Sequence, residues 1–329
     1  MVHGGNVRVG PLRLGRLRAL PTVMLATVVM VGALVVAGIT PAAPSDAAVP
    51  TAPPGWTTVW SEDFTGSAGT GVDTAKWLYD TGISYPGGAA HWGTGELETM
   101  TSSTANVSVD GEGHLAITPL RDASGAWTSG RIETTRTDFA APAGGILRVQ
   151  ASIRQPDVTS SDGLGYWPAF WMLGGAARPV GATNWPGIGE IDIMEDVNGR
   201  SSEFGTLHCG TNPGGPCQET TGIGSGERAC PNCQTGFHEY AMELDRSVSP
   251  EQIRWYLDGT NFFTVKATQV DPTAWANATH NGFFIILNVA MGGSFPDHLP
   301  PGGPTSGTVP GRPMLVDYVA VFQKPATSG

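Results

Sequence analysis

The chain has 329 residues, of which 40% are hydrophobic and only 14% are charged. That length is enough for one large core, and 46 glycines with 26 prolines favour many strands joined by turns over a helical protein. Beyond residue 48 the sequence has 14 basic and 28 acidic residues and no basic cluster, which argues against nucleic-acid binding.

The first 48 residues have the pattern of a signal peptide. Four arginines precede an apolar run at 19–39, and the small residues at 45–48 offer a cleavage site. The run could also span a bilayer, so a membrane-tethered protein is the alternative. We expect cleavage, a linker at 49–55, one domain at 56–324 and a tail at 325–329. The mature protein would then be secreted and extracellular, without stable membrane association.

From Trp56 onward, short runs of alternating or apolar residues separated by turns predict strands. In chain order these are 57–64, 106–109, 114–118, 145–154, 207–208, 239–244, 252–257, 261–265, 283–289 and 314–322. The run at 283–289 is almost wholly apolar, which is typical of a strand buried on both faces. Only 271–276 suggests a short helix. We predict an all-β protein, a monomer in which two antiparallel sheets form a jelly-roll, concanavalin A-like sandwich.

A further strand is predicted at 189–196 (GEIDIMED), and three of its acids, Glu190, Asp192 and Glu195, are candidates for catalysis. Residues two apart share a strand face, so Glu190 and Asp192 point one way and Ile191 and Ile193 the other. A β-bulge at 193–194 would bring Glu195 to the acidic face as well. The carboxyl groups of the two glutamates could then approach to about 5 Å, the separation expected of a retaining glycosidase.

This geometry suggests Glu190 as nucleophile, Glu195 as acid/base and Asp192 between them, supporting the charge and hydrogen bonding of Glu190. The structural alternatives for the same residues are a solvated acidic strand edge or a calcium loop.

A series of segments in chain order resembles glycoside hydrolase family 16, in its laminarinase-like group. These are 60–64 (WSEDF), 95–98 (GELE), 128–132 (TSGRI), 166–173 (YWPAFWML), 185–186 (WP), the acidic strand, 237–240 (FHEY), 255–259 (WYLDG), 287–293 (LNVAMGG) and 316–319 (VDYV). The resemblance covers residues 56–323. It implies the jelly-roll fold, and it gives the first glutamate of the acidic strand as nucleophile and the last as acid/base.

Aromatic side chains are the expected substrate contacts, because sugar rings pack their C–H faces on indoles. Trp167 and Trp171 share one strand face, and Trp185 directly precedes the acidic strand. His208 follows the strand by a turn and a return strand, and could reach the acids. Core packing or a structural role is the alternative for each. Trp92, in the glycine-rich loop at 91–95, could line a distal subsite. The resemblance adds Arg131, Asn288 and Glu96 at positions bordering the cleft, where they could equally fix loops.

The resemblance also implies a structural Ca²⁺ site away from the acids, although no cofactor is required for the chemistry. Its counterparts here are Asp63, the backbone carbonyl of Gly113, and Asp317, an all-oxygen set that suits Ca²⁺. The order Glu62-Asp63 is the reverse of the usual one, which weakens this match.

All four cysteines lie in one glycine- and proline-rich insertion at 209–234. Four cysteines allow three pairings, and nearest-neighbour pairing, Cys209 with Cys217 and Cys230 with Cys233, is the simplest. A zinc site is the competing interpretation. Typical laminarinases lack this insertion, which leaves the exact substrate open because loops set subsite shape.

Together these features predict a secreted, retaining endo-glycosidase acting on a polysaccharide. The resemblance favours β-1,3-glucan, with β-1,3-galactan, agar-type galactan and mixed-linkage glucan as alternatives. A non-catalytic, lectin-like carbohydrate-binding protein is the rival from another class, since the same sandwich also builds lectins.

Overall fold

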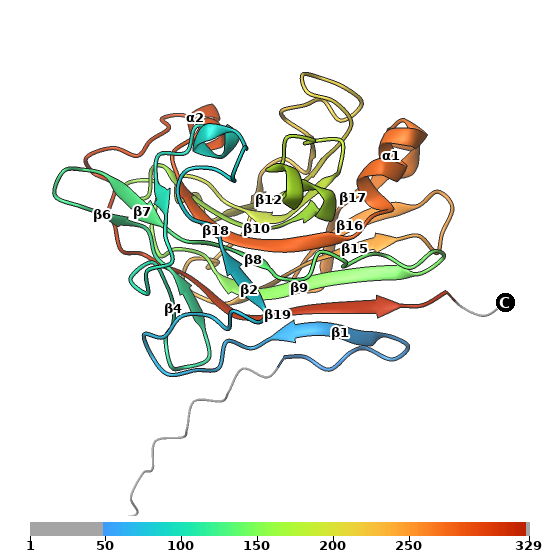
Figure 1. Ribbon diagram of the computed structural model, residues 1–329, viewed down its shortest axis with the longest axis horizontal. Helices are drawn as coiled ribbons and strands as arrows, with labels where there is room; N and C mark the ends of the chain where they lie inside the picture. Colours follow the sequence, from blue (N-terminus) through green and yellow to red (C-terminus); the bar gives the residue numbers. More distant parts are fainter. Residues whose placement is uncertain (1–48, 327–329) are drawn as a thin grey trace, which may run out of the picture. The chain divides into compact units, whose positions relative to one another are not determined.

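The computed structural model describes residues 49–326, so the predicted signal peptide at 1–48 and residues 327–329 of the predicted tail lie outside the described residues. Two sheets of eight strands each are stacked as layers, with a small third sheet beside them (Figure 1). The long strands pair antiparallel within each layer. This confirms the predicted all-β sandwich of two antiparallel sheets.

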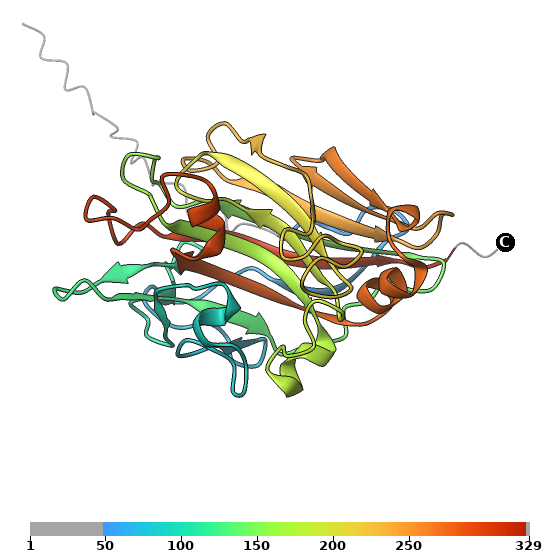
Figure 2. The same cartoon turned by 90° about the horizontal axis from the view of Figure 1, so that it is seen from above.

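The strand orders show which distant segments become neighbours. One layer, the β9 sheet, runs β17 (Thr260–Lys266), β16 (Gln252–Leu257), β15 (His238–Asp245), β9 (Ile146–Arg154), β19 (Met314–Lys324), β5 (Leu115–Ile117) and β4 (Val107–Val109), with β1 (Thr57–Glu62) also paired to β19. The other layer, the β10 sheet, runs β13 (Ile223–Gly224), β12 (Ser202–His208), β11 (Glu190–Glu195), β10 (Tyr166–Gly174), β18 (Phe283–Met291), β8 (Arg131–Thr134) and β2 (Trp77–Tyr79), with β14 (Arg228–Ala229) paired to β12. The third sheet contains β3 (Thr99–Met100), β7 (Trp127–Ser129) and β6 (Leu120–Arg121). Figure 2 shows β18, from near the end of the chain, running alongside its sheet neighbour β10 from the middle of the chain.

The predicted strands are confirmed wherever the apolar pattern was long. The strand predicted at 283–289 forms β18, in which every residue is buried. Its inner face joins the core between the sheets, and its outer face packs under a loop that includes Trp185 and Ile188. The predicted linker also takes part in packing, because Val49 and Ala52 lie against a cluster on β19.

Helices are short and stand at the ends of strands. The predicted helix forms α1 (Pro272–Thr279), whose N-cap Asp271 accepts hydrogen bonds from two backbone N–H groups of the first turn. The sequence did not predict α2 (Ser294–His298), a single turn that contains a proline, or the 3-10 turns η1 (Ala90–Gly93), η2 (Gly175–Val180) and η3 (Ala267–Gln269). None of the helices within 49–326 has the length and hydrophobicity needed to cross a bilayer.

The predicted β-bulge is present in β11. Asp192 lies opposite Thr206 and Glu195 opposite Phe204, so Ile193 and Met194 together face a single residue of β12, Gly205. An extra residue disrupts the hydrogen-bond ladder locally. Here the indole N–H of buried Trp255 donates to the backbone carbonyl of Asp192 at 2.7 Å.

Gly205 makes this contact possible. A Cβ atom at this position would come within 2.6 Å of the Trp255 ring. A side chain there would therefore push the indole away from the carbonyl that it satisfies, so glycine opposite the bulge and tryptophan beneath it act together.

The bulge contact predicts a loss of stability in the Trp255→Phe variant. Phenylalanine removes the indole N–H that donates to this buried carbonyl, and loss of a partner from a buried acceptor costs about 1–3 kcal/mol. Trp77→Phe is the matched control, since Trp77 is equally buried and its indole N–H has no partner within 49–326. Urea unfolding should show Trp255→Phe losing about 1–3 kcal/mol more than the control. Equal losses would show that the hydrogen bond contributes nothing.

Candidate active site

The three acids of β11 share the outer face of the β10 sheet. Ile191 and Ile193 point into the core between the sheets, and the bulge turns Glu195 back to the side of Glu190 and Asp192. We call Glu190, Asp192 and Glu195 the acidic row. Cross-strand pairing places His208 of β12 opposite Glu190, at one end of this row. All three acids are largely buried, so each carboxyl group depends on nearby partners rather than on bulk water.

Each glutamate receives a hydrogen bond from a tryptophan that the sequence had singled out. The Trp185 indole donates to Glu190 Oε2 at 3.1 Å, and the Trp167 indole donates to Glu195 Oε1 at 2.7 Å. Both rings remain partly exposed. Their indole N–H groups orient the acids, and their apolar faces remain available for packing.

Burial and crowding make both glutamates weak acids. Burial, followed by the nearby charge of Asp192, raises the pKa of Glu190 to about 8. The same two causes raise the pKa of Glu195 well above its ordinary value, and the Trp167 N–H opposes the shift. A carboxyl group held protonated beside other acids is suited to donating a proton.

His208 lies against the acids. The sequence left open whether it would reach them or have a purely structural role, and the structure places it beside them. Its Nε2 atom is 3.3 Å from Asp192 Oδ2 and 3.8 Å from Glu190 Oε1. Its Nδ1 atom is 2.7 Å from Glu219 Oε2, a carboxylate in the cysteine-containing insertion. Burial alone would lower the pKa of His208, but its contacts with Asp192 and Glu219 raise it well above the usual range.

Arg131 lies beside the acids and is nearly fully buried. Its guanidinium donates to Asp80 at 2.9 Å and to the Tyr85 hydroxyl at 2.8 Å. Three aromatic rings surround it, with its central carbon 5.1 Å from the ring of Tyr85, 4.4 Å from Trp92 and 4.8 Å from Trp171. Arg131 therefore fixes the position of two predicted substrate-contacting tryptophans through cation–π contacts.

Further polar partners complete this region. Glu133 accepts from the Tyr85 hydroxyl at 2.9 Å and pairs with Arg178 at 2.6 Å. Sequence reasoning missed Asp80, Tyr85, Glu133, Arg178 and Glu219. Of these, only Glu133 had a local signal, since it lies two residues from Arg131 on the same strand.

Asn288 and Glu96 are the remaining predicted substrate contacts. Asn288 is buried and accepts from the Trp171 indole at 2.8 Å, so its amide positions that ring. Glu96 is buried beside Glu98 and accepts from the Thr94 hydroxyl at 2.6 Å. Burial, and then the charge of Glu96, raise the pKa of Glu98 well above its ordinary value.

The predicted Ca²⁺ ligands lie away from the acidic row. Asp317 on β19 has a buried Oδ1 atom with no hydrogen-bond partner among residues 49–326, which is the kind of oxygen that a cation would complete. Oδ1 of Asp63 already accepts from the amide and hydroxyl of Thr65. The oxygens of Glu62 are occupied by two backbone N–H groups and by Lys76. Asp317 fits the metal best, and Asp63 fits it less well.

The four cysteines form two disulfides, Cys209–Cys217 and Cys230–Cys233, which is the predicted nearest-neighbour pairing. All four are fully buried. Bonded cysteines cannot supply thiolates to a zinc ion, so the zinc interpretation is wrong.

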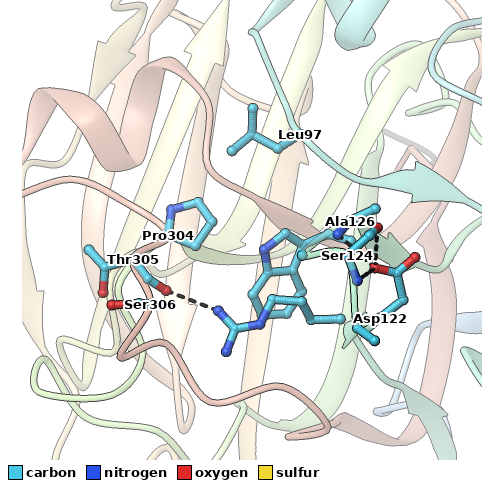
Figure 3. A pocket seen from close by; sticks show the side chains of 11 residues that line it. Leu97, Asp122, Ser124, Ala126, Pro304, Thr305 and Ser306 are labelled. Atoms are coloured by element: carbon cyan, nitrogen blue, oxygen red, sulfur yellow. Dashed lines mark hydrogen bonds between the residues drawn. The ribbon is translucent and has the colours of Figure 1, made fainter.

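A pocket of about 590 Å³ lies apart from the acids, between the β6–β7 hairpin and the loop at 304–306 (Figure 3). Its polar groups are already used locally. The Asp122 carboxylate accepts from Ser124 and Ala126 of its own turn, and the Arg121 guanidinium lies over Trp127 and donates to the Thr305 carbonyl. None of the three acids of β11 lines this pocket.

The raised pKa of Glu190 predicts a pH-dependent effect of Glu190→Gln on stability. A carboxyl group whose pKa is raised from 4.5 to about 8 on folding supports the folded state at low pH, and that support is lost as pH rises through 8. Glutamine removes this titration. The variant should therefore gain stability relative to the parent between pH 4.5 and pH 8.5 in urea unfolding. The control is Glu227→Gln, because Arg200 lowers the pKa of that exposed carboxyl and the variant should show no such gain. A constant difference between Glu190→Gln and the parent at all pH values would contradict the assignment.

Known proteins are similar to this chain over most of the described residues. A family model described as XgeA-like, catalytic GH16 domain, matches residues 157–239, which include the acidic strand and the insertion. The solved endo-1,3-beta-glucanase from Streptomyces sioyaensis is 61% identical, with a TM-score of 0.82, over 84% of this chain and all of that one.

Two curated relatives agree. Glucan endo-1,3-beta-glucosidase A1 of Niallia circulans is 32% identical over 87% of this chain, which spans only 40% of that protein's length. Beta-glucanase of Rhodothermus marinus is 31% identical over 82% of this chain and 86% of its own length. With the acid-bearing bulged strand in place, this similarity shows that the chain is a glycoside hydrolase and belongs to family 16, in its laminarinase-like group.

Proposed function

We propose that this chain is a retaining endo-1,3-β-glucanase with Glu190 as nucleophile and Glu195 as acid/base. The observation that carries the proposal is the placement of both glutamates on one face of β11, each held by a tryptophan N–H, with Asp192 between them. The enzymatic activity of the similar glucanases supports the choice of substrate.

The proposed reaction has two displacements. Glu190 attacks the anomeric carbon while Glu195 donates its proton to the leaving glycosidic oxygen, and the broken C–O bond is replaced by a glycosyl ester. Glu195, now ionised, takes a proton from water, which attacks the same carbon and releases Glu190. Two inversions give net retention of configuration.

The surroundings of each glutamate support its role. The attacking group must be ionised. The pKa of Glu190 is raised to about 8, so we assign the attack to its ionised form, which the Trp185 N–H and the His208 ring beside it stabilise. Glu195 must begin protonated, and burial next to Asp192 favours that form. Trp167, Trp171 and Trp92 then supply faces for the flanking sugars.

Other polysaccharides are alternatives within the same mechanism. Relatives include a keratan-sulfate endo-1,4-beta-galactosidase and a non-specific endo-beta-1,3(4)-glucanase. Galactans and mixed-linkage glucan therefore belong in any substrate test. A lectin-like protein would have no need of the complete acidic set.

We also propose that the enzyme is secreted, since two disulfides are expected of a protein from an oxidising compartment. A structural Ca²⁺ held by Asp317, with the Gly113 carbonyl and Asp63, is a further part of the proposal, supported by the unpartnered oxygen of Asp317.

We expect both Glu190→Gln and Glu195→Gln to fold and to lose activity on laminarin by at least about 100-fold, because each removes a group that moves a proton or forms a bond. Products from laminarin, lichenan, agarose and β-1,3-galactan would be separated by size. Release of oligosaccharides from laminarin by the parent enzyme is the expected result. If the enzyme hydrolysed only a galactan, the proposed mechanism would stand and the proposed substrate would be wrong.

Alanine variants with added azide separate the two roles, using an aryl glycoside whose leaving group needs no proton. In Glu195→Ala, azide should replace water in the second step and give the β-glycosyl azide. In Glu190→Ala, azide should attack directly and give the α-anomer. NMR of the anomeric proton identifies each product, and the opposite assignment of anomers would reverse the two roles. Glu227→Gln should retain full activity.

Chelation should lower the thermal midpoint if Ca²⁺ is bound as proposed. At a free ion concentration of about 100 Kd, binding contributes about 2.7 kcal/mol, which corresponds to a fall of about 5 °C or more on removal. Scanning calorimetry with and without EDTA would measure it, and added Ca²⁺ should restore the midpoint. The Asp317→Asn variant should not respond to EDTA. A parent enzyme with the same midpoint under both conditions would eliminate the site.

A further inference from the structure

Glu219 is the one fully buried acid that the insertion at 209–234 sends toward the active site. Its side chain has no exposed surface, and both oxygens are used. Oε2 is 2.7 Å from His208 Nδ1, and Oε1 accepts from the backbone N–H of Cys209 at 2.8 Å. A carboxylate is thus placed on the far side of the imidazole from Asp192 and Glu190.

The insertion holds Glu219 in this position from two sides. The Cys209–Cys217 disulfide closes the loop that directly precedes Gln218 and Glu219. Gly214 and Glu219 also exchange backbone hydrogen bonds as an isolated β-bridge, with the Gly214 N–H donating at 2.7 Å. The carboxylate is therefore attached to a cross-linked turn and not to a free loop.

The same insertion also confines the His208 ring. A Cβ atom at Gly222 would lie 2.9 Å from His208 Cε1 and 3.0 Å from Nδ1, so the backbone there lies directly against the imidazole. The Trp185 ring is 5.6 Å away, centroid to centroid. With these neighbours, the ring cannot turn away from the acids without displacing the insertion.

The carboxyl groups on both sides of the ring favour one protonation state of His208, with Glu219 Oε2 2.7 Å from Nδ1 and Asp192 Oδ2 3.3 Å from Nε2. A neutral imidazole has one N–H group and one lone pair. Either tautomer would turn a lone pair toward a carboxylate, Glu219 on one side or Asp192 on the other. Only the imidazolium, with both nitrogens protonated, offers a donor to both. The titratable groups that surround it are Glu190, Asp192 and Glu195 from β11 and Glu219 from the insertion, while Arg131 from β8 also acts on Glu190.

We propose that Glu219 is a positioning residue of the glycosidase, which keeps His208 doubly protonated and directed at Asp192 and Glu190. The inference rests on the proposed function, since the positive charge of His208 would support ionised Glu190 as nucleophile. It gives the disulfide-closed insertion a role in catalysis, by supplying a buried carboxylate to the ring.

The test is Glu219→Gln, with pH profiles of kcat and KM on laminarin. The amide can accept from Cys209 through its oxygen and donate to His208 Nδ1 through its NH₂, which stabilises the neutral ring. The alkaline limb of kcat should move at least about one pH unit toward acid, and kcat above that limb should fall about tenfold, because one pKa unit is a tenfold change in protonation. KM should change little. Glu219→Asp retains the charge and should restore part of the parent profile.

Glu227→Gln, an exposed acid of the same insertion, is the matched control and should leave the profile unchanged. A Glu219→Gln profile that superimposes on the parent's would overturn the proposal. So would an equal loss of kcat at every pH accompanied by a lower thermal midpoint, since that describes a merely structural residue.

A ¹⁵N NMR titration of His208, assigned with His208→Gln, tests the same point without activity. Both ring nitrogens should be protonated at pH 7 in the parent, and the transition should move to lower pH in Glu219→Gln. A neutral ring at pH 7 in the parent would overturn the proposal even if the variant failed to fold. If the parent hydrolysed no β-1,3-glucan, the titration would still decide the role of Glu219, so the two failures are distinguishable.

Discussion

One extra residue in β11 is the constraint on which the site depends. Without it, strict alternation would send Glu195 into the apolar layer with Ile191 and Ile193, where a carboxyl group has no partner. The bulge puts Glu195 on the outer face, and the Trp255 indole satisfies the carbonyl of Asp192 beside it. Glycine opposite the bulge lets that indole approach. The position of Glu195 is thus linked to a contact on the opposite face of the same sheet.

The bulge places three carboxyl groups on one face of β11, and the surrounding hydrogen-bond donors offset their mutual repulsion. Desolvation disfavours the ionised forms of Glu190 and Glu195, and the nearby charge of Asp192 adds to this effect. The compensating groups are few and directional: an indole N–H for each glutamate, and the ring of His208 for Asp192 and Glu190. Glu219 in turn contacts the other nitrogen of the His208 ring. Because each glutamate has its own indole donor, protonation can differ between neighbouring acids, which a two-step glycosidase reaction requires.

A second cluster beside the acids has a buried cation at its centre instead of acids. Arg131 is a single buried cation that holds Asp80 and Tyr85 by hydrogen bonds and lies between the rings of Trp92 and Trp171. Its planar guanidinium can form hydrogen bonds at its edge and stack on its faces simultaneously, which lysine cannot do. The rings proposed to contact sugars are therefore fixed before any substrate arrives. Such preorganisation reduces the entropy that binding must overcome.

The sequence by itself determined what is local or periodic. Alternation and apolar runs predicted the long strands, the buried character of β18 and the bulge at 193–194, because two-residue periodicity assigns faces without knowledge of the partners. Close spacing also predicted the disulfide pairing. Only the tertiary structure brought together Asp80 with Arg131 and Glu219 with His208, and only it placed α2. Those contacts depend on how irregular loops return to the sheet, and loop paths are set by packing and turn geometry rather than by any repeating pattern. An acid such as Glu219, surrounded in sequence by polar and small residues, becomes part of a site only when the fold buries it.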